Sequence, residues 1–187
     1  MTAAGHRRDT CWEHVAEPAA TLPCNAAQGA ASEEEARVHD ATPISAEDVR
    51  ALVYRALYGM VVGDIGAAGR FTDDVHGDSP GMCVRSRTEL EFALEDRAGV
   101  LSNVEFALVD VDETDRGLIA TWRASGDHTG GALFNEDQYF EPSGQRIAVS
   151  ATTHVTLRDG RIEGFRTDYD EGDVFDQFRG GPSRGRA

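Results

Sequence analysis

Apolar residues recur at helical spacing where the patterned part of the chain begins. Ser45 is a suitable helix N-cap, and acidic residues follow it in the first turn. Two further helices are expected, one over residues 65–71 and one that starts from Ser86 or Thr88 and ends at Gly99. The apolar positions on one face of the first helix are Val49, Leu52, Val53, Leu57, Met60 and Val61.

After Gly99 the apolar period changes from that of a helix to that of a strand. Residues 104–111 alternate, but the alternation slips near Leu108, which indicates either a β-bulge or a strand covered on both faces. Asp159 and Gly160 form a two-residue hairpin turn between the last two strands. The later strands are expected at residues 118–127, 146–158 and 161–169.

The order of these segments is helices, then a meander of strands, then a helix capped by Asp170. This order is typical of an α+β fold. Antiparallel strands leave one face free to pack against helices, so we expect a curved antiparallel sheet on the N-terminal helices, with an internal pocket. The domain should span residues 45–178. Residues 1–42, an acidic arm, and the Arg- and Gly-rich residues 179–187 are predicted to be disordered.

Composition narrows the range of partners. The 187 residues carry a net charge of −15, whereas nucleic acids and anionic membranes require a basic face, so neither is an expected partner. The basic residues are all Arg, which excludes a Schiff-base lysine. Cys11 and His14 have a C-x-x-H spacing without a second ligand pair, so we predict no metal site. The lack of a signal-like or spanning apolar segment predicts a cytoplasmic location.

Five short segments, taken together, have the order and spacing of one family. They are FTDDVHGDSPG (71–81), WRASGDHTG (122–130), PSGQR (142–146), RDGRI (158–162) and DYD (168–170). In combination they resemble the SnoaL-like polyketide cyclases of the nuclear transport factor 2 superfamily. The resemblance covers roughly residues 46–178.

This resemblance implies a cone-shaped α+β barrel that is often a homodimer through its sheet. Family members with known activity close polyketide rings by an intramolecular aldol reaction, with an acidic residue and a His in the pocket and no metal or cofactor. Relatives isomerise ketosteroids or open epoxides with pocket Asp, Tyr and Arg residues. The resemblance therefore implies a small apolar or polyketide-like ligand and no cofactor.

The strand over residues 118–128 supplies the main candidate acid–base residue. Residues two apart share a face, and the set that contains Trp122 and His128 is apolar except for the histidine. His128 also occupies the position of the His in the family motif. An imidazole beside an apolar wall has a lowered pKa and can exchange a proton with an enol or enolate. We predict a catalytic role for His128 and a substrate-binding role for Trp122.

Two acidic residues are candidate catalytic partners of His128. Asp78 lies just before Pro80, where an Asp acts as base in the isomerase branch, although a turn residue bonding its own backbone explains Asp78 equally well. Asp168 and Tyr169 end the last strand, where an acid with a raised pKa could assist and a hydroxyl could donate to an oxyanion. Neighbours on a strand face opposite ways, so both cannot line the pocket without a bulge.

His76 and His154 are candidate substrate-binding residues, as is Tyr169. The cyclases carry an acidic residue on the strand that corresponds to residues 146–158, and this sequence has none there. His154 or Thr152 could occupy that space.

Two functions fit these residues. The first is an enzyme in which His128, with Asp78 or Asp168, removes a proton beside a carbonyl of a polyketide-like substrate, so that the enolate cyclises or isomerises. The second is a non-catalytic module of the same fold that binds a small apolar ligand or forms a dimer. The missing acidic residue of the third strand favours the second.

Overall fold

The computed structural model describes residues 45–131, 133–135 and 138–180. The disorder predicted for residues 1–42 lies outside this range, as does that of residues 181–187. The first two residues of the predicted tail are described: the backbone N–H groups of Arg179 and Gly180 donate to the carbonyls of Phe175 and Gln177.

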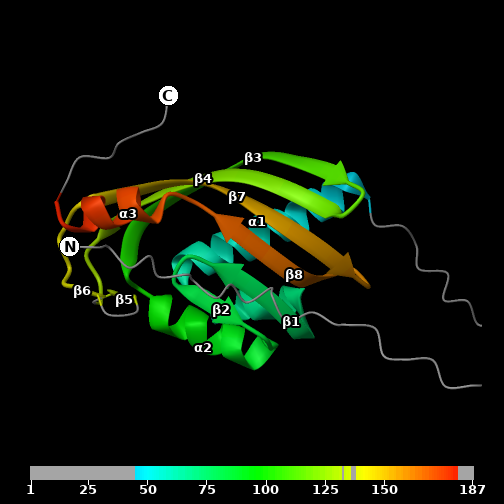
Figure 1. Cartoon of the computed structure of the whole chain (residues 1–187), viewed down its shortest axis with the longest axis horizontal. Coiled ribbons are helices and arrows are strands. Elements are labelled where there is room, and N and C mark those ends of the chain that lie inside the picture. The colour runs from blue at the N-terminus through cyan, green and yellow to red at the C-terminus, as the bar shows by residue number, and fades with distance from the viewer. Residues whose placement is uncertain (1–44, 132, 136–137, 181–187) are drawn as a thin grey trace, which may run out of the picture. The chain divides into compact units, whose positions relative to one another are not determined.

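The described residues form the predicted α+β architecture, with helices against one curved sheet (Figure 1). Six strands follow the order β2-β1-β8-β7-β4-β3, and β5 and β6 make a separate pair. Neighbouring strands are antiparallel except for β1 and β8, which are parallel. The strands are β1 (Phe71–Ser79), β2 (Met82–Val84), β3 (Leu101–Thr114), β4 (Gly117–His128), β5 (Leu133–Asn135), β6 (Gln138–Phe140), β7 (Arg146–Arg158) and β8 (Arg161–Asp168).

The helices begin where their capping residues predict. Each of the three α-helices has a side-chain oxygen of its N-cap that accepts a backbone N–H of the first turn: Ser45, Ser86 and Asp170. Of the two caps considered for the middle helix, Ser86 is the one used. Gly63, with φ of 72°, ends the first helix in the left-handed conformation that glycine adopts without strain. The helices are α1 (Ala46–Val62), η1 (Ile65–Arg70), α2 (Arg87–Arg97) and α3 (Glu171–Phe178).

The long strands pair as predicted, with one local irregularity. The β3–β4 register shifts between Leu108 and Asp110, which confirms the bulge rather than the doubly covered strand. Asp159 and Gly160 both have positive φ angles, as a two-residue hairpin turn requires. Buried and less buried residues alternate along β4, so the predicted apolar face of this strand is the one that turns inward.

The hairpin of β1 and β2 is the part of the sheet that the sequence pattern did not predict as strand. The turn-forming residues of HGDSPG (76–81) predict an extended segment broken by turns, and instead β1 runs unbroken to Ser79. Its partners are β2 on one side and, in parallel, β8 on the other. These non-local hydrogen bonds override the weak strand tendency of the local sequence.

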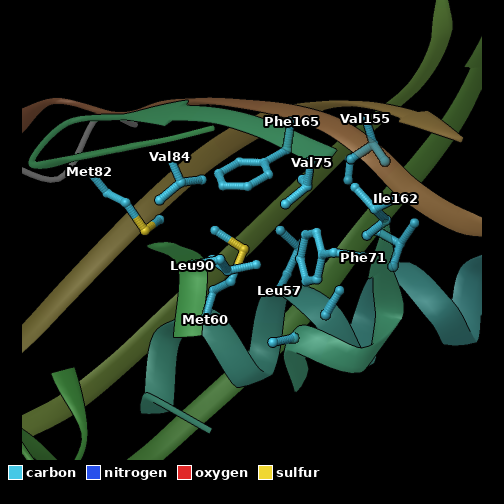
Figure 2. Close-up of a cluster of buried hydrophobic side chains, with 14 of the residues drawn as sticks. Leu57, Met60, Phe71, Val75, Met82, Val84, Leu90, Val155, Ile162 and Phe165 are labelled. Carbon is cyan, nitrogen blue, oxygen red and sulfur yellow. The ribbon is translucent and has the colours of Figure 1, made fainter. Parts of the chain in front are cut away.

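The hydrophobic core lies between the concave face of the sheet and the helices. Figure 2 shows Phe165 of β8 and Phe71 of β1 in its centre, with their rings 5.8 Å apart and edge to face. Both side chains are almost fully buried, with 2% and 0% exposure. A smaller cluster of Phe140, Ile147 and Phe178 lies where α3 packs against β7.

Gln177 attaches α3 to the open part of β7. β8 pairs with β7 only from Thr152 onward, so the earlier residues of β7 have no strand on that side. The Gln177 amide takes the place of a strand: Oε1 accepts from Ala148 N–H at 2.8 Å, and Nε2 donates to Ala148 O at 2.9 Å. This pair of hydrogen bonds holds α3, and the aromatic side chains that α3 carries, against the sheet.

We expect Gln177→Leu to lower the free energy of unfolding by about 1–3 kcal/mol, because it removes two partly buried hydrogen bonds to the backbone of Ala148. Urea denaturation of both proteins measures the difference. The matched control is Gln145→Leu, since Gln145 is exposed. Equal effects of the two substitutions would contradict the role given to Gln177.

Candidate functional site

A cavity of about 600 Å³ opens between α2, α3, the β1–β2 turn and the concave face of the sheet. This volume is within the usual range for small-molecule sites. The apolar side chains in its wall are those of Val61, Met82, Val84, Val100, Leu101, Trp122, Ile147, Val149, Val174, Phe175 and Phe178. Four ionisable residues interrupt this surface: Glu89, Asp96, Arg97 and Tyr169.

Trp122 lies in the wall as predicted, and a buried hydrogen-bond network fixes its orientation. Its indole Nε1 donates to Thr153 Oγ1 at 2.9 Å, and this oxygen is 2.9 Å from Thr167 Oγ1. Thr153 has no exposed surface. The threonines therefore satisfy the polar atom of the indole, so that its apolar rings can form part of the cavity wall.

One face of α2 supplies three of the ionisable groups. Glu89, Ala93, Asp96 and Arg97 all line the cavity, at the i, i+4, i+7 and i+8 spacing of a single helix face. Leu90 and Leu94, on the adjoining face, are fully buried in the core. The leucines thus fix the rotation of the helix and direct its charged face toward the cavity.

Arg97 and Tyr169 each donate a hydrogen bond to the turn between β1 and β2. The Tyr169 hydroxyl donates to Pro80 O at 3.0 Å, and Arg97 Nη2 donates to Gly81 O at 3.5 Å. Burial lowers the pKa of Arg97; burial also raises the pKa of Tyr169, and the neighbouring Arg97 cation partly offsets the latter change. At neutral pH the phenol therefore keeps its proton and remains a donor.

His128 is on the concave side of the sheet, as predicted, and it has no exposed surface. It does not itself line the cavity. Its ring packs edge to face on Phe178, which does line it, with ring centres 4.8 Å apart. Ser143 N and Oγ are 3.4 Å from Nδ1, while Nε2 makes no hydrogen bond with a described residue.

Burial lowers the pKa of His128 from its ordinary 6.5. The nearby backbone of Gly131 raises the pKa and so offsets part of the effect of burial. A lowered pKa means that the unfolded chain binds a proton more readily than the folded protein. The stability contributed by the neutral imidazole is therefore complete above pH 6.5 and is lost as pH falls below that value.

We accordingly expect the free energy of unfolding to decrease between pH 7.5 and pH 5, and His128→Asn to make this decrease shallower. Chemical denaturation at several pH values gives the two slopes. Identical slopes in the variant and the original protein would show that His128 does not titrate differently in the two states.

The other predicted site residues lie on the outer face of the sheet. Gly77 and Phe165 turn inward, so their strand neighbours Asp78 and Arg166, which are register partners, turn outward. Asp168 is exposed and lies 3.4 Å from Arg166 Nη2. Exposed His154 is the partner of Arg166 on β7.

His76 is on this outer face too. A side chain at Gly164, its register partner, would meet the imidazole Nε2 of His76. The structure thus gathers His76, Asp78, His154 and Asp168 on one face and places Trp122, Tyr169 and buried His128 on the other.

The sequence matches no protein-family model and no curated protein. Solved structures do match the fold. A protein from Jannaschia sp. CCS1 described as a SnoaL-like polyketide cyclase has a TM-score of 0.61 at 18% identity, over 75% of this chain and 97% of that one. TsrD from Streptomyces laurentii has a TM-score of 0.60 at 17% identity, over 73% and 98%. The chain has the SnoaL-like fold.

A more distant match extends the range of relatives with this SnoaL-like fold. An LEH-like epoxide hydrolase of M. tuberculosis has a TM-score of 0.52 at 16% identity, over 72% of this chain and 92% of that one. The resemblance predicted from the sequence motifs is therefore confirmed at the level of the fold. At these identities the likeness does not extend to a reaction.

Three cavity residues of this SnoaL-like domain were not predicted from the sequence: Glu89, Asp96 and Arg97. Charged residues on a helix usually form a solvated face, and their spacing looks the same whether that face meets water or a cavity. The one available signal was the i, i+7, i+8 spacing of these three residues beside the leucines of the adjoining face.

Two further observations concern partners of the SnoaL-like domain. Within the described part of the chain, no group of three or more His, Cys, Asp or Glu side chains is arranged to hold a metal ion. No described helix has the length and apolar character needed to cross a bilayer.

Proposed function

We propose that the chain is a small-molecule enzyme that performs acid–base chemistry without a cofactor. In this proposal a polyketide-like carbonyl compound binds in the cavity, loses a proton beside the carbonyl, and cyclises or isomerises through the enolate. The observation that carries the proposal is the apolar cavity of about 600 Å³ with Trp122 and the Tyr169 hydroxyl in its wall. Matches of the same fold to a polyketide cyclase and an epoxide hydrolase support it.

Tyr169 acts as the oxyanion donor in this proposal. Its hydroxyl turns from Pro80 O to the substrate oxygen, and it stabilises the negative charge that develops on that oxygen. The raised pKa keeps the phenol protonated throughout.

His128 is the proposed proton acceptor, since it is the one predicted acid–base residue on the concave side. Its lowered pKa keeps the imidazole neutral at pH 7, as a base must be. Phe178 packs on the imidazole and lines the cavity, and in this proposal it is the side chain that swings aside to allow the proton transfer. In an isomerisation the His128 imidazolium returns the proton to a carbon of the enolate. In a cyclisation the enolate carbon attacks a second carbonyl, and the imidazolium gives its proton to the resulting alkoxide.

The test is enolate formation on 2-tetralone, a compact apolar ketone, followed as hydrogen–deuterium exchange beside the carbonyl by proton NMR in D2O. We expect the protein to accelerate the exchange, and His128→Ala and Tyr169→Phe each to lower the rate by about 100-fold. Arg55→Gln, on the exposed side of α1, is the control and should leave the rate unchanged.

Absence of any acceleration would contradict the enzymatic proposal for this class of ketone. An acceleration that survives both variants would remove His128 and Tyr169 from the mechanism but leave the site.

The second candidate is a non-catalytic module that binds a small apolar ligand. It is favoured by the position of His128 behind Phe178 and by the absence of acidic residues along β7. In that case 2-tetralone should raise the melting temperature by mass action while the exchange rate stays at that of buffer.

We also propose that the chain forms a homodimer through the outer face of its sheet. This face carries Arg123, His154 and Arg166, so its interface would be polar. Light scattering after size exclusion gives the mass, and a monomer at all accessible concentrations would contradict the proposal.

A further inference from the structure

Arg97 lines the cavity, and no carboxylate of the described residues forms an ion pair with it. Its one hydrogen bond to a described residue, from Nη2 to Gly81 O, is long at 3.5 Å. A guanidinium has five N–H donors, so most of its donors have no acceptor from the described protein.

Such an arrangement costs free energy in the unliganded protein. A charge that loses contact with water needs pairing and hydrogen bonds, and Arg97 is half-buried with no ion pair among the described residues. Burial lowers the pKa of Arg97, which reports the same cost, but an arginine remains protonated at neutral pH. The cavity therefore keeps a positive charge with free donors in an otherwise mostly apolar wall.

The two carboxylates in the same wall do not neutralise it. Glu89 is exposed, and its Oε2 accepts the backbone N–H of Arg85 at 2.7 Å at the start of α2. Asp96 is also exposed. Both acids are thus in contact with solvent, whereas Arg97 is half-buried and its Nη2 lies 3.5 Å from Gly81 O.

We infer that the ligand of this cavity is an anion: an apolar body that ends in a planar carboxylate, which binds Arg97. A carboxylate matches the fork of the guanidinium and can accept two parallel N–H donors. The apolar body then packs against the aromatic wall formed by Trp122, Phe175 and Phe178. The inference uses the site of the proposed function and narrows its substrate class to carbonyl compounds that also carry a carboxylate.

A pair of probes that differ only in charge tests this inference. 2-Naphthoate and 2-naphthamide have the same apolar body, and isothermal titration calorimetry at pH 7 and low salt gives the Kd of each. We expect 2-naphthoate to bind at least about 10-fold more tightly, as a charge-assisted hydrogen bond predicts. Added NaCl should weaken the binding of 2-naphthoate more than the binding of 2-naphthamide.

Variants then assign the preference to one residue. Arg97→Gln should remove the preference for 2-naphthoate while changing the Kd of 2-naphthamide less than about twofold. Arg97→Lys should keep part of it, because the charge remains and the fork is lost. Arg55→Gln, on the exposed side of α1, should bind both probes as the unaltered protein does.

The outcomes separate this inference from the function on which it rests. Equal Kd values for the two probes in the unaltered protein overturn anion recognition and leave the cavity as a site for neutral ligands. A preference that Arg97→Gln does not diminish overturns the assignment to Arg97. Failure of both probes to bind overturns the inference and the proposed site together. If the protein prefers 2-naphthoate but does not accelerate hydrogen–deuterium exchange of 2-tetralone, the inference is supported and only the enzymatic proposal is contradicted.

Discussion

Replacing Gly77 with alanine should lower the free energy of unfolding by about 3 kcal/mol, an unusually large effect for a single methyl group. Gly77 is buried in β1, and a Cβ there would overlap atoms of the Phe165 ring. The ring cannot yield, because it is 2% exposed and packs against Phe71 in the centre of the core (Figure 2). The backbone at Gly77 is not in the left-handed region, so the cost is one of space alone.

Gly69→Ala is the matched control. Apart from its chain neighbours and the backbone of its own helix, no described residue has an atom within 4 Å of the position that its Cβ would take, so the change should stay within about 0.5 kcal/mol. A double variant, Gly77→Ala with Phe165→Leu, should lose less than the sum of the two single losses, because the smaller side chain makes room. Additive losses, measured by urea denaturation, would show that the Phe165 ring is not what excludes the methyl group.

The same close approach explains why the β1–β2 hairpin could not be predicted from its sequence. Along β1, Phe71 and Thr72 are buried, the next two residues are exposed, and Val75 and Gly77 are buried again, which is not a simple alternation. A glycine in the strand is unfavourable locally, yet here it is required by a ring from β8. The caps of the helices and the long alternation of β4 are local, and these were predicted correctly.

The residues of the site likewise fall into those that the local sequence pattern places and those that contacts between distant segments place. Trp122 and His128 could be placed on the concave side because they belong to one alternating strand. Arg97 could not be placed, because what its helix face meets depends on the turn at Pro80 and on the end of β8. The position of Phe178 between His128 and the cavity depends on α3, which is held by Gln177. Contacts between distant segments thus decide which of the candidate residues reach the ligand.

Phe178→Ala is the second substitution for which we expect a large effect, and it removes the contact between Phe178 and His128. Phe178 is 8% exposed and packs on Phe140 and His128, with ring centres 5.2 and 4.8 Å away. Its loss should lower the free energy of unfolding by about 3–5 kcal/mol. It should also connect His128 to the cavity, so that water reaches the imidazole and its pKa rises back toward 6.5.

The pKa follows from NMR titration of the His128 ring, and Phe175→Ala is the control. Phe175 also lines the cavity and stacks on Phe140, at 5.3 Å, but it makes no ring contact with His128, so this variant should leave the pKa of His128 where it is. If Phe178 gates a catalytic imidazole, Phe178→Ala should keep or increase the exchange on 2-tetralone, and the added variant His128→Ala should abolish it. If the pKa of His128 stays low in Phe178→Ala, this aromatic ring is not the barrier, and the proposed path for the proton is wrong.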